Sequence, residues 1–122
     1  MSAVDDLLAA ARASIEPRVA PEDLEAERRA GSLIVDTRTV DQRAVDGELP
    51  GAVPVERNVL EWRLDPGSPH RLPQMDRPDR RVVIVCDEGY ASSLAAATLR
   101  QLGLHDATDL AGGFRAWRRL GR

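Results

Sequence analysis

The sequence predicts an α/β fold: a three-layer α/β/α sandwich around a mostly parallel sheet of about five strands. The clearest strand signal is residues 82–85, Val-Val-Ile-Val, a β-branched run without alternation that is typical of a central strand covered on both faces. Similar short apolar runs alternate along the chain with longer segments whose apolar residues recur at helical spacings. The 122 residues suffice for one domain with one hydrophobic core.

In the N-terminal part, the spacing of apolar residues predicts a helix over residues 4–15, which Pro17 ends. Val19 is expected to form a very short strand. A second helix is predicted over residues 21–30, because its proline start is followed by acidic residues and a glycine comes after its end. The apolar run at residues 33–35 is too short for a helix and is typical of a buried strand.

The middle of the chain is predicted to be less regular. Residues 37–44 are polar and are expected to hold a helical turn. Glycine and proline mark a turn at residues 47–51, before a short strand at residues 52–53. A short helix is predicted over residues 58–64, with its first residue, an asparagine, as the cap. The proline-rich residues 65–79 are predicted to be a surface connection without regular structure.

The C-terminal part contains the strongest signals. After the strand at residues 82–85, a helix is predicted over residues 92–102, because Gly103 suits the position after a helix end. A short strand at residues 107–110 and a last helix over residues 114–120 complete the pattern. The chain is therefore divided into an N-terminal amphipathic helical extension, residues 1–17, and the domain itself, residues 18–122.

Composition and charge exclude several classes of function. Hydrophobic residues make up 43% of the chain and charged residues 30%, which is ordinary for a globular protein. A net charge of −3 leaves no excess of cations for phosphates, so nucleic acid is not an expected partner. The chain lacks the basic start of a signal peptide and an apolar run of bilayer length, so no membrane association and a cytoplasmic location are expected. The sequence leaves the oligomeric state open.

Cys86, the single cysteine, is the candidate reactive residue. It follows the most central strand and precedes a helix, at the carboxyl edge where parallel sheets bind ligands. The helix dipole, inward-facing amides of the glycine-containing loop and the hydroxyls of Ser92 and Ser93 would each favour the thiolate. The alternative is a cysteine that packs as a small hydrophobic residue, but the residues after it, Asp-Glu-Gly, are poor core residues.

Taken with motifs elsewhere in the chain, this region resembles the rhodanese (sulfurtransferase) family. The motifs that carry the resemblance are Ile34-Val35-Asp36-Thr37-Arg38, Gly47-Glu48-Leu49-Pro50-Gly51-Ala52, Val85-Cys86 with Gly89 and Ser92, and Leu110-Ala111-Gly112-Gly113-Phe114-Arg115-Ala116-Trp117. None of these motifs is specific alone, but their order and spacing together are.

The resemblance implies that Cys86 takes a sulfane sulfur from thiosulfate or from an organic or protein persulfide, and passes it to a thiophilic acceptor, a small molecule or a protein. It implies covalent catalysis in two half-reactions, with no cofactor and no metal. The loop that would hold the outer sulfur consists of Asp87, Glu88, Gly89, Tyr90, Ala91 and Ser92.

This loop contains no cation. Cysteine phosphatases place an arginine six residues after the cysteine, where Ser92 stands, so phosphatase chemistry is not expected. Many family loops carry a basic residue where Ala91 stands. The carboxylates of Asp87 and Glu88 would repel a dianion, so we predict weak thiosulfate activity and a preference for a neutral, organic or protein persulfide donor. Arg57 is a candidate substrate contact; a solvated arginine is the alternative.

Several other residues are assigned structural roles. Asp36 and Arg38 are predicted to form an ion pair that ties the end of a strand to neighbouring loops. Glu48 stands where the family often has histidine, so no role is transferred to it. His70 and His105 lie at no metal-ligand spacing and are expected at the surface.

The aromatic residues divide between core and site. Phe114 and Trp117, with Leu120 nearby, have helical spacing and are expected in the core. Trp62 suits either the core or the pocket wall, and Tyr90 is expected at the pocket entrance.

A rival function stays open from the sequence. The domain would then be a non-catalytic rhodanese-like module that binds a partner protein, with Cys86 idle or acting as a redox sensor. The acidic loop without arginine favours this rival. Mass spectrometry after treatment with a persulfide donor distinguishes the two, because a thiolate takes up the sulfur.

Overall fold

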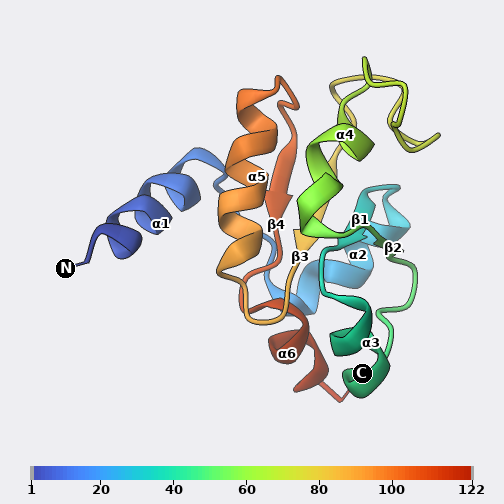
Figure 1. Cartoon of the computed structure of the whole chain (residues 1–122). Helices are drawn as coiled ribbons and strands as arrows, with labels where there is room; N and C mark the ends of the chain where they lie inside the picture. The colour runs from blue at the N-terminus through green and yellow to red at the C-terminus, as the bar shows by residue number, and fades with distance from the viewer. Residues whose placement is uncertain (1, 122) are drawn as a thin grey trace.

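The computed structural model describes residues 2–121, which form four parallel strands in the order β2-β1-β3-β4 with helices on both faces of the sheet (Figure 1). The regular elements, in chain order, are α1 (Ala3–Ser14), η1 (Pro21–Asp23), α2 (Leu24–Arg29), β1 (Leu33–Asp36), α3 (Val40–Asp46), β2 (Val53–Pro54), η2 (Arg57–Val59), α4 (Leu60–Leu64), β3 (Val82–Val85), α5 (Ala91–Gln101), β4 (Ala107–Asp109) and α6 (Gly113–Arg118). The α/β class and the parallel sheet expected from the sequence are therefore confirmed.

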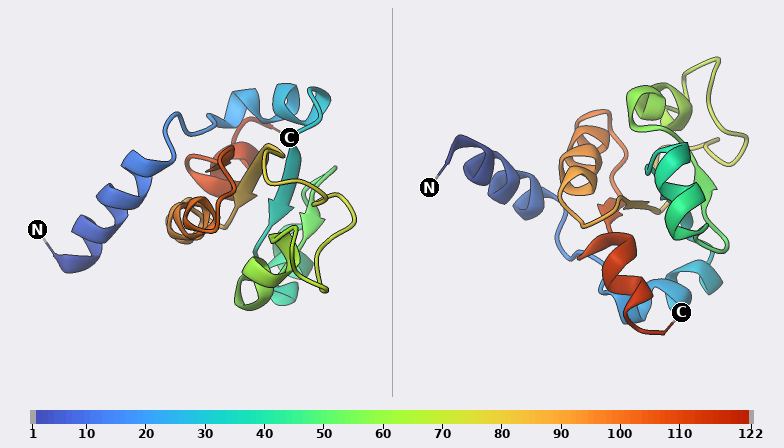
Figure 2. Two further views of the ribbon diagram at one scale, coloured as in Figure 1. Left: turned by 90° about the horizontal axis from the view of Figure 1, so that it is seen from above. Right: turned by 60° about the horizontal axis from the view of Figure 1, so that its bottom comes forward.

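The central strands divide the core into two layers because successive side chains of a strand point to opposite faces. Leu33 and Val82 belong to one cluster, which α4 and α5 cover. Ile34 and Val83 belong to the other, which also contains Phe114 from α6. Viewed from above in Figure 2, α2 and the pair α4 and α5 lie on opposite sides of the sheet.

Helix α1 projects from the body of the domain in every view (Figures 1 and 2). Ser2 caps it and forms a capping box with Asp5. Its C-terminal half packs along α5, where Ala11 is buried, and the following residue Ile15 is fully buried in the core. The N-terminal half is exposed; Leu7, for example, retains 58% of its accessible surface.

Some expectations from the sequence are wrong in detail. The sheet has four strands rather than about five, because Val19 makes only a single parallel bridge, to Leu110. Pro17 and Pro21, which bracket Val19, lack the N–H groups that a longer ladder needs. The predicted helix 21–30 begins with a separate 3₁₀ turn, η1.

Asn58 is not a helix cap. It lies inside η2, and α4 begins after Val59 without a side-chain cap. The proline-rich stretch 65–79 has turns only, as predicted. It is nevertheless fixed to the core through Leu72 and Met75, which are both buried. No helix within residues 2–121 is long and apolar enough to cross a membrane.

Candidate active site

Cys86 lies directly after β3, at the carboxyl edge of the sheet, in the loop between β3 and α5 at the lower end of α5 in Figure 1. The carboxyl ends of the neighbouring strands β1 and β4 bring Asp36 and Asp109 to the same edge. Cys86 retains 8% of its accessible surface as a residue and borders a cavity of about 320 Å³. The cavity wall includes Arg57, Glu88 and Tyr90.

Two backbone N–H groups donate hydrogen bonds to the sulfur of Cys86. They belong to Gly89, at 3.1 Å, and Ser92, at 3.3 Å. Donors fixed in this way interact more strongly with a thiolate than with a neutral thiol, because a hydrogen bond to an ionised acceptor is the stronger kind. We call this arrangement, formed by Cys86 and the N–H groups of Gly89 and Ser92, the sulfur cradle.

Gly89 is required by the shape of the loop. Its φ of +86° lies in the left-handed region, and a Cβ added there would approach the backbone nitrogen of Gly112 to 2.7 Å. The Gly112-Gly113 pair at the start of α6 has no side chains and therefore permits this close approach. As a result, the N–H of Phe114 donates a hydrogen bond to the carbonyl of Cys86 at 2.9 Å. The glycine-glycine motif therefore packs directly against the loop that carries the cysteine.

The hydroxyls of Ser92 and Ser93 do not serve the sulfur, contrary to expectation. Both reach Oδ2 of Asp109, at 2.7 and 2.8 Å. Asp109 is fully buried, and Arg18 also donates to it through Nε at 2.7 Å and Nη2 at 3.1 Å. A buried carboxylate attracts hydroxyl donors more strongly than a sulfur atom does, which explains the difference.

The two loop carboxylates have different surroundings. Asp87 accepts a hydrogen bond of 2.8 Å from Nε of Arg115 on α6, and this bond raises the pKa of Arg115 above its usual value. Glu88 is exposed and borders the cavity. Of the two charges that oppose an anionic substrate, Asp87 is thus largely neutralised by its partner and Glu88 is the more open.

Arg57 lies at the cavity, where the sequence placed a candidate contact. It is 39% exposed at its side chain and forms a bidentate pair with Glu61, at 3.0 and 2.9 Å. Tyr90, 59% exposed, lies at the rim, and Ala91 also borders the cavity. Trp62 is exposed and does not border it, so neither position considered for Trp62 is correct.

The structure contains the ion pair predicted between Asp36 and Arg38. Asp36 and Arg38 form a buried ion pair of 2.8 Å, and the Arg38 guanidinium stacks on the ring of Phe114 with 3.6 Å to the centroid. Glu48 pairs with Arg43 at 2.7 Å. Leu120 is 45% exposed, so its expected place in the core is wrong.

Phe114 is buried, Trp117 is partly buried against it, and both histidines, His70 and His105, are exposed. Within residues 2–121, no group of three or more His, Cys, Asp or Glu side chains is placed to hold a metal ion.

Sequence reasoning missed three residues near the loop. They are Asp109, Arg12 and Arg18. Asp109 ends a strand beside the cysteine strand, and the rule that singled out Cys86 would also have found it. Arg12 and Arg18 lie more than 70 residues from the loop that they contact, so no local pattern indicates them.

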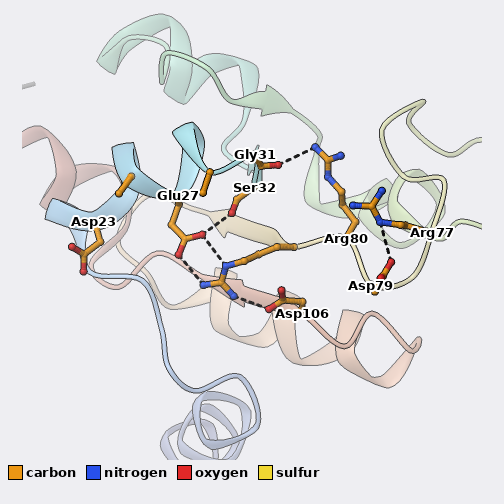
Figure 3. Close-up of a pocket in the computed structure, with 11 residues that line it drawn as sticks. Asp23, Glu27, Gly31, Ser32, Arg77, Asp79, Arg80 and Asp106 are labelled. Atoms are coloured by element: carbon orange, nitrogen blue, oxygen red, sulfur yellow. Dashed lines mark hydrogen bonds and ion pairs between the residues drawn. The ribbon is translucent and has the colours of Figure 1, made fainter.

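A larger hollow, of about 620 Å³, lies at the opposite edge of the sheet (Figure 3). Ser32, Arg81 and Asp106, which directly precede β1, β3 and β4, contribute to it. Several of its charges are paired with one another: Arg81 joins Glu27 at 2.8 Å and Asp106 at 2.7 Å, and Arg77 joins Asp79 at 3.0 Å. This pairing lowers the pKa of Glu27 below its usual value and ties the amino ends of the strands together.

The chain is similar to known proteins both in sequence and in fold. The model of the rhodanese-like domain family matches residues 20–120. A protein named thiosulfate sulfurtransferase GlpE from Pseudomonas fluorescens is 33% identical over 102 residues, which cover 83% of this chain and 84% of its own. The GlpE protein of Pseudomonas aeruginosa is 32% identical over 101 residues and 83% of each chain.

Solved structures agree with the fold. A protein of unknown function from Rhodopseudomonas palustris, described as a possible tyrosine phosphatase, superimposes with a TM-score of 0.86 and 34% identity over 99% of this chain and 92% of its own. The human single-domain sulfurtransferase superimposes with a TM-score of 0.67 and 23% identity over 84% of this chain and 96% of its own. At 23% identity, the similarity to the human protein concerns the fold alone.

Proposed function

Because this chain belongs to the rhodanese-like domain family, we propose that it is a sulfurtransferase in which Cys86 carries a sulfane sulfur as a persulfide. The observation that carries the proposal is the sulfur cradle: the sulfur accepts N–H bonds from Gly89 and Ser92 beside an open cavity. Two fixed N–H donors interact more strongly with a thiolate sulfur, the nucleophilic form, than with a neutral thiol.

In the first half-reaction the thiolate of Cys86 attacks the sulfane sulfur of the donor. A sulfur–sulfur bond to Cys86 forms while the donor's own sulfur–sulfur bond breaks, and its electron pair leaves with sulfite or with an organic thiolate. In the second half-reaction a thiophilic acceptor attacks the outer sulfur, and Cys86 leaves again as the thiolate. The chain needs no external oxidant or reductant for either step.

The charges around the cavity indicate the kind of donor. Glu88 opposes a dianion at the cavity. Arg57 also lines the cavity and can attract a carboxylate group of an organic donor, but its pairing with Glu61 weakens this attraction. We therefore propose an organic or protein persulfide as the better donor and thiosulfate as a weak one. A single unpaired cysteine stays reduced in the cytoplasm, where we propose that the protein works.

One of the similar solved structures is described as a possible tyrosine phosphatase, so the loop after Cys86 is compared with what phosphate binding requires. Bidentate binding of a phosphate needs an arginine fork facing the cysteine. The loop residue six positions after Cys86 is Ser92, whose hydroxyl is bound to Asp109. Residues 87–91 contain no arginine or lysine. These features support sulfur transfer over phosphate hydrolysis.

A steady-state assay tests the proposal. The full chain is mixed with an organic persulfide, such as glutathione persulfide, or with thiosulfate, and thiocyanate formation from cyanide is measured. We expect turnover with parallel double-reciprocal lines, the pattern of a ping-pong reaction, and no turnover in Cys86→Ser. Hydrolysis of p-nitrophenyl phosphate without any sulfur transfer would contradict the proposal, and so would a chain inactive with both donors, which would favour the non-catalytic or redox-sensing module.

A further inference from the structure

The carbonyl oxygen of Gly89 accepts hydrogen bonds from two guanidinium groups, and Oγ of Ser93 lies 3.2 Å from the same oxygen. Nη2 of Arg12 donates to it at 2.9 Å, and Nη2 of Arg18 donates to it at 3.0 Å. Bonds from charged donors are the stronger kind, so the two guanidinium groups, at the shorter distances, are the main partners of this oxygen and the Ser93 hydroxyl is a weaker third. Gly89 is thus held on both sides, with its N–H on the sulfur of Cys86 and its C=O between two arginines.

Arg12 reaches the loop at further points. Its Nε donates to Oγ of Ser93 at 3.2 Å, and its guanidinium lies 5.4 Å from the centroid of the Tyr90 ring. Both distances fall within the range of attractive interactions for a guanidinium. Arg12 therefore contacts three residues of the segment that folds around the sulfur, and it is not itself part of the cavity wall.

The two arginines differ in their charge balance. Arg18 is neutralised by the fully buried carboxylate of Asp109. Arg12 forms no ion pair within the part of the chain that the structure describes, residues 2–121. One uncompensated positive charge consequently lies behind a loop whose own charges are the acids Asp87 and Glu88. Both arginines also precede residue 20, where the match to the family model begins.

We propose that Arg12 and Arg18 are positioning residues of the active site, which fix the Gly89 peptide so that its N–H points at the sulfur of Cys86 and supply the positive charge that the loop lacks. Without them the Gly89 carbonyl loses both charged partners, and the glycine, free in φ, lets the neighbouring peptides turn away from the sulfur. Helix α1, which carries Arg12, is then part of the catalytic apparatus. This role rests on the proposed function, since the cradle serves sulfur transfer.

The test uses the full chain with Arg12→Ala, Arg12→Lys and, as a matched control, Arg29→Ala, which removes an exposed arginine of α2. The first measurement is the rate of Cys86 alkylation by iodoacetamide at neutral pH, which reports on the cradle whether or not sulfur is transferred. We expect Arg12→Ala to be about 5- to 10-fold slower than the natural chain. Arg12→Lys should recover most of the rate, because an ammonium group can also donate to the Gly89 carbonyl, and Arg29→Ala should stay within about 2-fold.

Two further readouts separate positioning from general damage. In sulfur transfer, kcat of Arg12→Ala should fall by a similar factor with KM nearly unchanged, because Arg12 does not border the cavity. The amide proton resonance of Gly89 should move upfield in Arg12→Ala as its bond to sulfur weakens, while resonances of β1 and β3 stay in place. An unchanged alkylation rate and an unchanged Gly89 resonance in Arg12→Ala would overturn the proposal, as would Arg12→Lys being as slow as Arg12→Ala.

If the natural chain takes up no sulfur but the alkylation rates follow this order, the proposed function fails and the positioning role stands. If sulfur transfer occurs and Arg12→Ala alkylates and turns over at the natural rate, the positioning role fails alone. Because Arg12 lies on the projecting helix α1, its replacement leaves the two core clusters intact.

Discussion

Asp87 and Arg115 form a hydrogen-bonded ion pair, with Nε of Arg115 2.8 Å from Oδ2 of Asp87, next to the nucleophile candidate Cys86. Arg115 comes from α6 and also lies 3.4 Å from Asp46. An acidic residue can therefore follow the cysteine because a cation from another element compensates it.

We expect Arg115→Gln to lower thiosulfate kcat/KM about 3-fold, because the uncovered charge of Asp87 would repel the dianion. Arg118→Gln, on the same helix, is the control and should have no such effect. Initial rates of thiocyanate formation at low salt measure both variants. Equal rates for the two variants would show that the pairing of Asp87 does not matter for the donor.

Replacing Glu88 should act in the opposite direction. Its carboxylate borders the cavity, so Glu88→Gln removes a repulsion of about 1 kcal/mol, and thiosulfate KM should fall about 5-fold. The gain should shrink as salt is added, since exposed charges are screened. Glu22→Gln, an exposed acid of η1, serves as the control. A KM that does not change at low ionic strength would contradict the proposal that Glu88 weakens thiosulfate as a donor.

Asp109 should be important for stability as well as for the site. Asp109→Asn leaves Arg18 without its carboxylate in a buried network that also includes Ser92 and Ser93. We expect a loss of about 2–4 kcal/mol in the free energy of unfolding, measured by urea titration. Asp41→Asn, at an exposed site, should cost less than about 0.5 kcal/mol. A loss for Asp109→Asn as small as that control would refute the role of this network.

Glu27 makes stability depend on pH in a predictable direction. Hydrogen bonds from Arg81 and Ser32 lower its pKa in the folded chain below the usual 4.5. Its contribution is therefore present above pH 4.5 and is lost as the pH falls through the lower folded-state pKa. We expect Glu27→Gln to cost about 1–2 kcal/mol at pH 7 and progressively less as the pH falls below 4.5.

Urea unfolding of the natural chain and of Glu27→Gln at several pH values checks this, with Glu22→Gln as an exposed control. A difference between the two chains that is the same at pH 7 and at acid pH would mean that the pairing of Glu27 with Arg81 contributes nothing through its charge.

The sequence was sufficient for the features that depend on neighbouring residues. The run Val82–Val85 forms β3 with the predicted bounds. Cys86 lies at the end of β3 because a parallel strand is followed by a loop at its carboxyl end. The helix after the loop, α5, begins one residue before its predicted start. Each of these follows from composition and spacing over a few residues.

The sequence was insufficient where the contact partner is remote. Arg12 and Arg18 meet Gly89 across 77 and 71 residues, and nothing near Gly89 encodes a partner for its carbonyl. The direction of the Ser92 and Ser93 hydroxyls also depends on a remote residue, Asp109, 17 and 16 residues further along. The hydrogen-bond partner of such a carbonyl or hydroxyl depends on which buried polar groups lie near it in the folded chain and need a partner.

The central claim is that Cys86 holds a sulfur atom, and intact-mass spectrometry tests it most directly. The chain is treated with an organic persulfide, freed of the donor and weighed before any acceptor is added. The account predicts a gain of about 32 Da that disappears on addition of cyanide and never forms in Cys86→Ser, because only a thiolate can take up the sulfur. A folded chain whose Cys86 reacts with iodoacetamide but gains no mass from the persulfide would contradict it.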